Sequence, residues 1–321
     1  MRLLNTRTLE LEQFVGEDKP CYAILSHTWG PDEVLFEDIF PSRADKPWAN
    51  RLGAAKIQGA AELAAKEGFN YIWIDTCCIA KSSSAELSEV INSMFRWYSK
   101  STVCYAYLSD VSINPHNNRN NLKDYDGRWF SEWFRRTWTE LIVPEHVQFF
   151  DKDWNPLGSR RTLADLLHTI TRIDHQLFQD RQTSDITDLL NKHSVHSKMS
   201  WASNRKSTRP EDKACSLMGL FNVNMPLLYG EGGQKAFQRL QEAIVKVSND
   251  QSMLLHRGRS WPLASNFVET NITHGKLERK VIKLRRSVSL QTLGSSNLSP
   301  YMTNPRLSLQ PIINSAPAYD L

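Results

Sequence analysis

The chain has 321 residues, of which 40% are hydrophobic, and its ten tryptophans add bulk for the core of one large or two modest domains. The five cysteines are odd in number, and their spacing excludes a disulfide framework and a zinc site. The formal net charge is +4, but residues 256–321 carry nine Lys and Arg against three Asp and Glu, which leaves residues 1–255 slightly acidic.

These features exclude two classes of protein. A nucleic-acid-binding domain needs a basic stripe on its folded body. Residues 1–255 carry a slight net negative charge and contain no such stripe. The sequence contains no run of roughly 18 apolar residues, the length of a membrane span, and its first residues lack the apolar core of a signal peptide. We therefore expect a cytoplasmic protein that binds neither nucleic acid nor metal and does not span a membrane.

Three short apolar runs alternate with helical patterns in the first third of the chain. The runs cover residues 22–25, 71–74 and 102–108, and each has the length of a strand. Apolar residues recur at helical spacing over 52–67 and 85–98. Uniformly apolar strands separated by amphipathic helices indicate βαβ units, so we predict an α/β domain with a doubly wound parallel sheet flanked by helices.

Beyond residue 114 the pattern changes from alternating strands and helices to mostly helices. A polar loop over 114–127 precedes one further predicted strand over 147–150. The last part of the chain loses all periodicity and gains Ser, Asn, Pro and Arg, which indicates disorder. Helical periodicity occurs over 161–171, 186–199, 210–220 and 234–247. We divide the chain into an α/β domain over 1–160, a helical extension over 161–252 and a disordered basic tail over 253–321.

Polar side chains follow the predicted strands at the points where they end. Ser26, His27 and Trp29 follow the first run, and Asp75 follows the second. Open α/β sheets bind ligands at the carboxyl ends of their strands, so these four residues are candidate ligand-binding residues. The alternative is structural: a histidine that donates to a backbone carbonyl, and an aspartate that caps a helix or forms a loop ion pair.

Three other positions have both a chemical and a structural interpretation. Lys81, followed by three serines at a predicted helix start, suits a phosphate, although it lacks the glycines of a P-loop and a plain cap explains it as well. Cys77 and Cys78 offer a nucleophile that His27 would activate, but buried cysteines are more often small hydrophobic residues. Arg135 either binds a phosphate or belongs to a solvated face.

Six segments contain extended motifs: YAILSHTWG at 22–30, YIWIDTCCI at 71–79, RWFSEWFRRTWTEL at 128–141, MSWASNR at 199–205, RPEDKA at 209–214 and MPLLYGEGG at 225–233. In this order, and over about residues 1–252, the chain resembles the fungal heterokaryon incompatibility (HET) family. The resemblance implies a protein that triggers programmed cell death after non-self recognition, through signalling partners and self-association.

The HET family is also distantly similar to TIR domains, which have a flavodoxin-like parallel sheet. Some TIR domains cleave NAD with a glutamate on a Trp-x-x-x-Glu helix, so the resemblance implies NAD as substrate and Glu140 as catalytic acid. HET sequences usually read Trp-Thr-Leu-Gln-Glu there, whereas this chain reads Trp138-Thr139-Glu140. Helix positions two apart point in nearly opposite directions, so a non-catalytic interaction module or a degraded inactive paralogue are the alternatives.

Overall fold

A computed structural model describes residues 1–16, 18–41, 46–112, 131–135, 139–179, 185–202, 207–250 and 252. These residues all belong to one compact unit, Met1–Phe267. Three predictions fall outside them: the polar loop over 114–127, the disordered tail over 253–321 and the side chain of Trp138.

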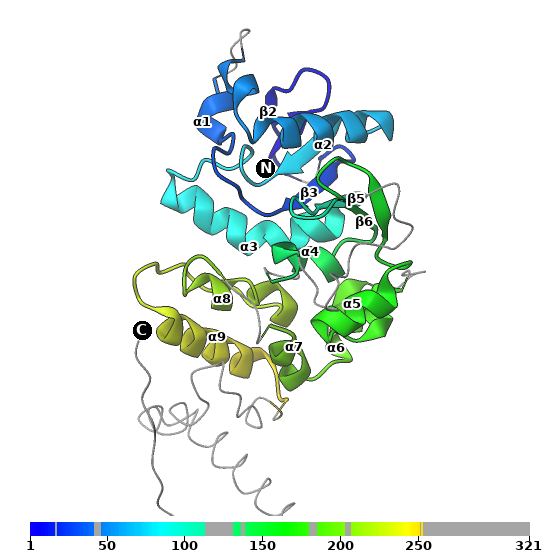
Figure 1. The fold of residues 1–321 in the computed structure, drawn as a ribbon. Helices are drawn as coiled ribbons and strands as arrows, with labels where there is room; N and C mark the ends of the chain where they lie inside the picture. The colour runs from blue at the N-terminus through cyan, green and yellow to red at the C-terminus, as the bar shows by residue number, and fades with distance from the viewer. Residues whose placement is uncertain are drawn as a thin grey trace, which may run out of the picture. The chain divides into compact units, whose positions relative to one another are not determined.

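A seven-stranded mixed sheet forms the centre of the α/β part (Figure 1). Its strand order is β2-β1-β4-β3-β5-β6-β7. The four central strands β4, β3, β5 and β6 are parallel, whereas β1, β2 and β7 are antiparallel to their neighbours. The strands are β1 Arg2–Asn5, β2 Leu11–Gln13, β3 Ala23–His27, β4 Tyr71–Ile74, β5 Val103–Tyr107, β6 Val147–Phe150 and β7 Pro156–Ser159.

The expectation of a parallel sheet is thus confirmed at the centre and wrong at both sides. The three antiparallel strands have only three or four residues each and lack a continuous apolar run. β7 begins with Pro156 and contains Gly158, two residue types that are rare in central strands and tolerated at a sheet edge. Strands this short are fixed by pairing with a neighbour, and a sequence pattern does not reveal that partner.

The register brings the carboxyl ends of the parallel strands to one edge of the sheet. Leu25 of β3 is paired with Ile74 at the end of β4, and His27 with Tyr107 at the end of β5. The chain leaves β3 for β4 on one side and then crosses to β5 on the other. The strand order therefore reverses at β3, and such switch points are where open α/β sheets bind ligands.

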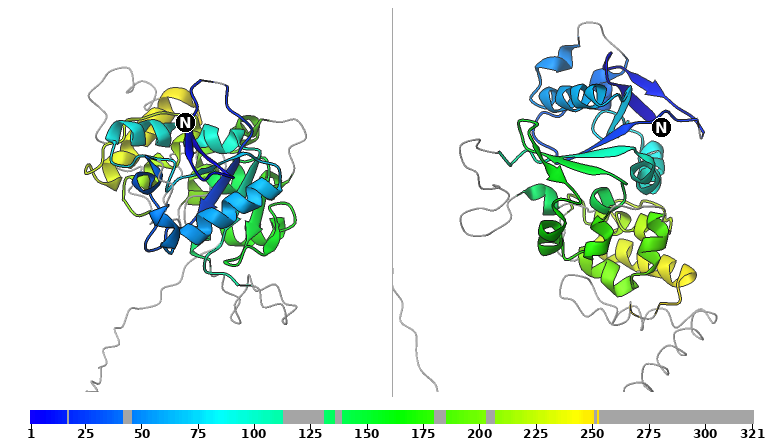
Figure 2. Two further views of the ribbon diagram at one scale, coloured as in Figure 1. Left: turned by 90° about the horizontal axis from the view of Figure 1, so that it is seen from above. Right: turned by 90° about the vertical axis from the view of Figure 1, so that its right-hand side faces the viewer.

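Helices cover both faces of the sheet (Figures 1 and 2). α2 lies on one face, and α3 and α4 lie on the other. The Ser83 hydroxyl accepts a hydrogen bond from the Glu86 backbone N–H and caps α3, as the serine run predicts. The elements of this part are α1 Phe36–Ile39, η1 Pro47–Asn50, α2 Ala54–Lys66, α3 Ser84–Lys100, η2 Glu132–Arg135 and α4 Thr139–Ile142.

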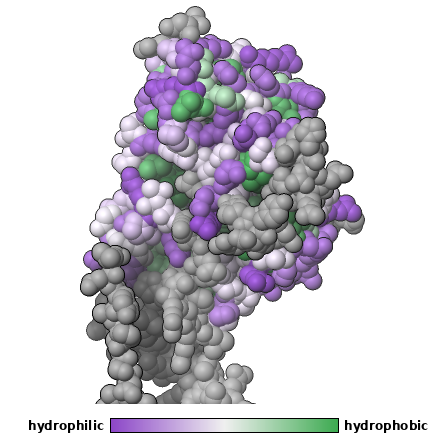
Figure 3. Space-filling view, in the orientation of Figure 1, coloured by the Kyte–Doolittle hydropathy of each residue, from purple (hydrophilic) through white to green (hydrophobic). Residues whose placement is uncertain are grey.

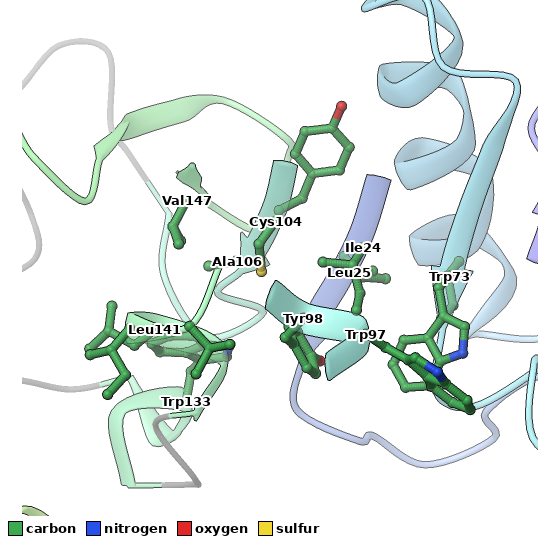
Figure 4. Packing of buried hydrophobic residues seen from close by; sticks show 14 of the residues in the cluster. Ile24, Leu25, Trp73, Trp97, Tyr98, Cys104, Ala106, Trp133, Leu141 and Val147 are labelled. Carbon is green, nitrogen blue, oxygen red and sulfur yellow. The ribbon is translucent and has the colours of Figure 1, made fainter. Parts of the chain in front are cut away.

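The core between the sheet and α3 is rich in aromatic rings (Figure 4). Trp97 and Tyr98 of α3 lie under β3, and the Trp97 ring meets Trp73 of β4 edge-on with centroids 5.6 Å apart. Trp133 and Leu141 extend this layer beneath β5. Edge-to-face contacts add stabilisation beyond burial alone, so this layer holds α3 in a fixed position on the sheet.

The helical extension packs on the far side of α3, as Figure 1 shows. A methyl group added at Gly219 would lie 2.4 Å from the side chain of Phe95, so glycine permits this close approach. The elements are α5 Ala164–Thr171, η3 His175–Phe178, α6 Ile186–Asn191, α7 Val195–Ala202, α8 Asp212–Cys215, η4 Met218–Phe221 and α9 Gly233–Val247.

The single helix predicted over 186–199 is two helices. α6 ends at Asn191, and α7 starts at Val195. The Asp250 carboxylate accepts a hydrogen bond from the Val195 N–H at 2.7 Å, and the Ser252 hydroxyl accepts one from His196 at 3.0 Å. These caps come from a segment more than fifty residues away, which explains why local periodicity did not predict the break.

The surface is mixed in polarity. Figure 3 shows hydrophilic residues interspersed with small hydrophobic areas on one face of the molecule. The large hydrophobic residues that are exposed come from separate elements and include Val15, Phe40, Leu52 and Val247. In the part of the chain that the structure describes, no helix combines the length and the apolar character that crossing a bilayer requires.

Candidate functional site

A cleft of about 260 Å³ lies at the carboxyl edge of the parallel strands. One wall consists of strand ends and the first turns of α3, and the other comes from the helical extension. Five of the seven residues predicted as site residues line this cleft, and a sixth, Ser26, contacts two of the lining side chains. The lining residues are His27, Trp29, Asp75, Ile79, Lys81, Leu87, Ile91, Met94, Trp133, Glu140, Ser207, Thr208, Asp212, Cys215, Ser216 and Tyr229.

Asp75 is the centre of a hydrogen-bonded group at the ends of β3 and β4. Its Oδ1 lies 2.9 Å from Nε2 of His27, and its Oδ2 accepts a hydrogen bond from the Trp29 indole N–H at 2.8 Å. The other ring nitrogen of His27, Nδ1, is 3.2 Å from the Thr28 carbonyl oxygen. The carboxylate thus fixes the orientation of both aromatic rings at the floor of the cleft.

The charge state of Asp75 follows from these contacts. Burial by itself raises the pKa of the carboxyl group, but His27, Lys81 and the hydrogen bonds from His27 and Trp29 hold the pKa well below its usual value. Its side chain keeps 28% of its surface exposed. Asp75 is therefore an anion that borders the cleft.

Lys81 places a cation over the Trp29 ring. Its Nζ lies 3.2 Å from the ring centroid and is buried, and within the described residues it has no hydrogen-bond partner. Burial lowers the pKa of the ammonium group, while the nearby Asp75, Cys77 and Glu33 act in the opposite direction. An ammonium group has three donors, so Lys81 retains donors for an anionic ligand in the cleft.

Glu140 joins the same site from α4. The Ser26 hydroxyl donates to Oε2 of Glu140 and accepts a hydrogen bond from the Trp133 indole N–H at 2.9 Å. Burial and the nearby Glu140 carboxylate both raise the pKa of the Tyr98 hydroxyl well above its usual value. Glu140 therefore faces the strand ends, despite the shortened spacing to Trp138.

Arg160 holds α4 in place, and sequence reasoning did not identify it. α4 has only four residues, too few to be stable alone. The buried Arg160 Nη1 donates to the carbonyls of Leu141, Ile142 and Pro144 at 3.2, 3.3 and 2.7 Å. Its Nη2 donates to the Glu145 carbonyl at 2.6 Å. One guanidinium thus satisfies the carbonyls at the end of the helix that carries Glu140.

A buried ion pair, Lys56 with Glu33, supports the loop that carries His27 and Trp29. Lys56 Nζ lies 2.5 Å from Oε1 of Glu33 and donates to the Thr28 carbonyl at 3.3 Å. The same Glu33 oxygen accepts a hydrogen bond from the Gly30 N–H at 2.6 Å. The loop after β3 is therefore fixed at both ends by one lysine and one glutamate, neither of which the sequence pattern singled out.

Two predicted chemical roles receive no geometric support. Arg135 is 53% exposed, pairs with Glu132 at 2.7 Å and is not a lining residue of the cleft. Cys77 and Cys78 are buried, and the pKa of Cys77 is raised well above its usual value by hydrogen bonding to Cys78 and by burial. A buried neutral thiol is a poor nucleophile, and Nε2 of His27 contacts Asp75 instead.

The side chains in the described ranges offer no metal centre, because no three His, Cys, Asp or Glu residues there are grouped closely enough to hold an ion. The cleft contains three carboxylates (Asp75, Glu140 and Asp212), one ammonium group (Lys81) and two indole rings (Trp29 and Trp133). Such a set can bind a small molecule that combines hydroxyl groups, an anionic group and an aromatic ring.

The fold and the cleft define an α/β protein with a candidate ligand site at its strand ends. The family described as "Heterokaryon incompatibility protein (HET)" matches residues 22–126. The vegetative incompatibility protein HET-E-1 of Podospora anserina is 44% identical over 238 residues, which cover 71% of this chain and 16% of that protein. The chain is therefore a heterokaryon incompatibility (HET) domain protein that spans a small part of the length of this relative. No solved structure matches it.

Proposed function

We propose that this chain is a cytoplasmic effector of heterokaryon incompatibility that triggers programmed cell death by binding NAD in the strand-end cleft and cleaving it. The observation that carries the proposal is the convergence of Ser26, His27, Asp75, Lys81 and Glu140 on one cleft. The name of the relative HET-E-1 supports the role in incompatibility. The order of the four parallel strands supports the distant TIR resemblance, because it is the order of flavodoxin-like sheets.

The side chains of the cleft suit the parts of such a ligand. The ammonium group of Lys81 would pair with a phosphate, and carboxylates accept hydrogen bonds from ribose hydroxyls. The volume of about 260 Å³ is small beside the roughly 300–1,000 Å³ of typical ligand pockets, so the cleft would hold one nucleoside half of the dinucleotide. The other half would extend beyond it.

Glu140 would act at the bond between the ribose and nicotinamide. As this C–N bond breaks, its electron pair leaves with nicotinamide, and positive charge develops on the ribose, where a carboxylate stabilises it. A water molecule then forms the new C–O bond and gives up a proton, which Glu140 accepts and passes to solvent. The products are nicotinamide, ADP-ribose and one proton, so the reaction needs no other reactant.

The test is turnover of NAD by the purified full chain, followed as release of nicotinamide. We expect Glu140→Gln to lower the rate by about 100-fold or more, because a positioned acid–base group contributes at least that much. Glu132→Gln is the matched control: Glu132 lies on η2, is exposed and lies outside the cleft, so this variant should keep the wild-type rate. A wild-type chain that binds NAD without any turnover would remove the catalytic step.

Expression in a fungal host separates the remaining functions. Growth arrest that is lost in Glu140→Gln supports an enzymatic effector. Arrest that survives both Glu140→Gln and Asp75→Asn, in a chain that does not bind NAD, indicates an interaction module that signals through protein partners or self-association. Verified folded expression without any phenotype indicates a degraded copy.

A further inference from the structure

The wall of the cleft opposite the strand ends comes from a part of the chain that the HET family match does not include. The match ends at residue 126, whereas this wall is formed by residues between Ser207 and Tyr229. Its most polar members are Asp212, at the first turn of α8, and Tyr229, in the turn before α9.

Asp212 and Tyr229 form one hydrogen-bonded unit. The Tyr229 hydroxyl donates to Oδ1 of Asp212 at 3.0 Å. The guanidinium of Arg209 stacks on the Tyr229 ring at 4.2 Å from its centroid and holds the ring from the other side. The Asp212 carboxylate also accepts a backbone hydrogen bond from Arg209. A carboxylate has about four acceptor sites, so these two bonds leave Asp212 able to accept hydrogen bonds from a ligand.

Glu211, the neighbour of Asp212, fixes the position of Tyr229. It is buried, and its Oε1 accepts hydrogen bonds from the N–H groups of Gly230 and Gly232, both at 3.0 Å. These glycines have φ angles of +93° and +85°, in the region that favours glycine. The turn therefore has one conformation relative to α8, and Tyr229 reaches Asp212 because of it.

This wall is also attached closely to the α/β part. η4 follows α8 directly and packs on α3 at Gly219, where any larger residue would collide with Phe95. α3 in turn begins just after Lys81, on the opposite wall. The two walls are thus joined through one helix, and the spacing between Lys81 and Asp212 is set by packed elements.

We propose that Asp212 binds the hydroxyl groups of the ligand's ribose and that Tyr229 orients Asp212 for this contact, so that the helical extension is part of the ligand site. The inference rests on the proposed function and names the sugar as the part of the nucleotide that this wall recognises. Lys81 on the opposite wall holds the anionic group. A carboxylate facing two adjacent hydroxyls accepts a hydrogen bond from each, and a neutral or phosphorylated ligand without them gains nothing from Asp212.

The test measures NAD affinity of the full chain by calorimetry. Asp212→Asn should weaken binding by about tenfold, the loss expected for a hydrogen bond to a charged group, and Tyr229→Phe by a smaller factor. The matched controls are Asp188→Asn, an exposed position on α6, and Tyr71→Phe, whose hydroxyl bonds to Glu12 at the far end of β4. Both should bind NAD like the wild type, and all variants should melt cooperatively.

A second measurement distinguishes the loss of a contact to the sugar from a general distortion of the cleft. Two NAD analogues, each lacking the hydroxyls of one ribose, are titrated against the wild type and Asp212→Asn. The analogue that lacks the hydroxyls contacted by Asp212 should bind the wild type about as weakly as NAD binds Asp212→Asn. Its affinity for Asp212→Asn should be no lower than its affinity for the wild type. If Asp212→Asn lowered the affinity for NAD and for both analogues by the same factor, the sugar assignment would be overturned.

Failure of the inference and failure of the proposed function give different results. If the wild type does not bind NAD at all, the proposed function falls. If the wild type binds NAD, Lys81→Ala weakens binding and Asp212→Asn matches its control, only the role of the second wall is wrong.

Discussion

At the level of single residues, Asp75 is the most closely surrounded charge of the strand-end wall. His27 and Trp29 take up both of its oxygens, and Lys81 adds a cation across the Trp29 ring. These contacts stabilise the anionic form of the carboxyl group and hold two rings in one orientation. The same contacts make the stability of the fold depend on pH.

We predict a loss of stability in acid that Asp75 helps to cause. Because the pKa of folded Asp75 lies below the usual 3.8, the unfolded chain binds this proton more readily. The stabilisation is therefore complete above about pH 5 and decreases as the pH falls below 3.8 toward the folded pKa. Thermal unfolding from pH 5 downward should show a steeper fall in Tm for the wild type than for Asp75→Asn.

Part of the acid sensitivity should remain in that variant. The hydrogen bond from Arg2 lowers the pKa of Glu86, which therefore contributes in the same direction. Asp188→Asn, at an exposed position of α6, should retain the wild-type slope. Equal slopes for the wild type and Asp75→Asn would show that the contacts of Asp75 do not stabilise its anionic form.

The strand-end residues could be predicted because two simple facts determine their place. Parallel strands end at the same edge, and Ser26, His27 and Asp75 directly follow or close such strands. Arg135 has no comparable constraint, since a basic residue in an aromatic segment looks the same whether it lines a cleft or pairs with Glu132 at the surface. Its position depends on the path of the chain between elements.

At the level of elements, α4 is the one that depends most on a distant residue. It carries Glu140 and ends where Arg160 binds four backbone carbonyls. A four-residue helix cannot provide for these groups by itself. The placement of the candidate catalytic carboxylate is therefore determined by a side chain from the segment that follows β7.

We predict that Arg160→Met lowers the free energy of unfolding by about 2 kcal/mol or more, since buried carbonyls lose charged hydrogen-bond donors. Urea unfolding followed by tryptophan fluorescence measures this change. If the cleft binds NAD as proposed, that binding should weaken as well, because α4 is no longer held against Ser26. The control is Arg7→Met, at an exposed turn position where, among the described residues, only the backbone N–H forms a hydrogen bond, and it should change stability by less than about 0.5 kcal/mol. Similar values for both variants would contradict the anchoring role of Arg160.

The elements that the sequence predicts well are those with a long internal pattern. α2, α3 and α9 have thirteen, seventeen and fifteen residues, and each was predicted within about three residues of its bounds. The short edge strands, the break between α6 and α7 and the placement of α4 depend on contacts between distant segments. Local periodicity contains no information on such contacts, which is why these features appeared only in the structure.

At the level of the whole molecule, the α/β part and the helical extension share α3. One side of α3 faces the sheet with Trp97 and Tyr98, and the other meets η4 at Phe95. The cleft lies along this same helix, with Leu87, Ile91 and Met94 in its lining. Where the two parts meet, each has an apolar face that the other part covers.

We therefore predict that a chain ending after residue 160 does not fold cooperatively. Removal of the extension exposes the apolar side of α3, including Ile91, Met94 and Phe95, and large exposed apolar patches cause aggregation. Circular dichroism during heating and size-exclusion chromatography, with the full chain as reference, measure the effect. A monomeric fragment with a sharp transition near the Tm of the full chain would contradict this prediction.

The two-walled cleft has a consequence for recombination between members of this family. Exchange of residues 22–126 alone would join the strand ends of one protein to the Asp212 wall of another, and the contact of Gly219 with Phe95 would have to be rebuilt by chance. A functional chimera should instead carry both segments from the same parent.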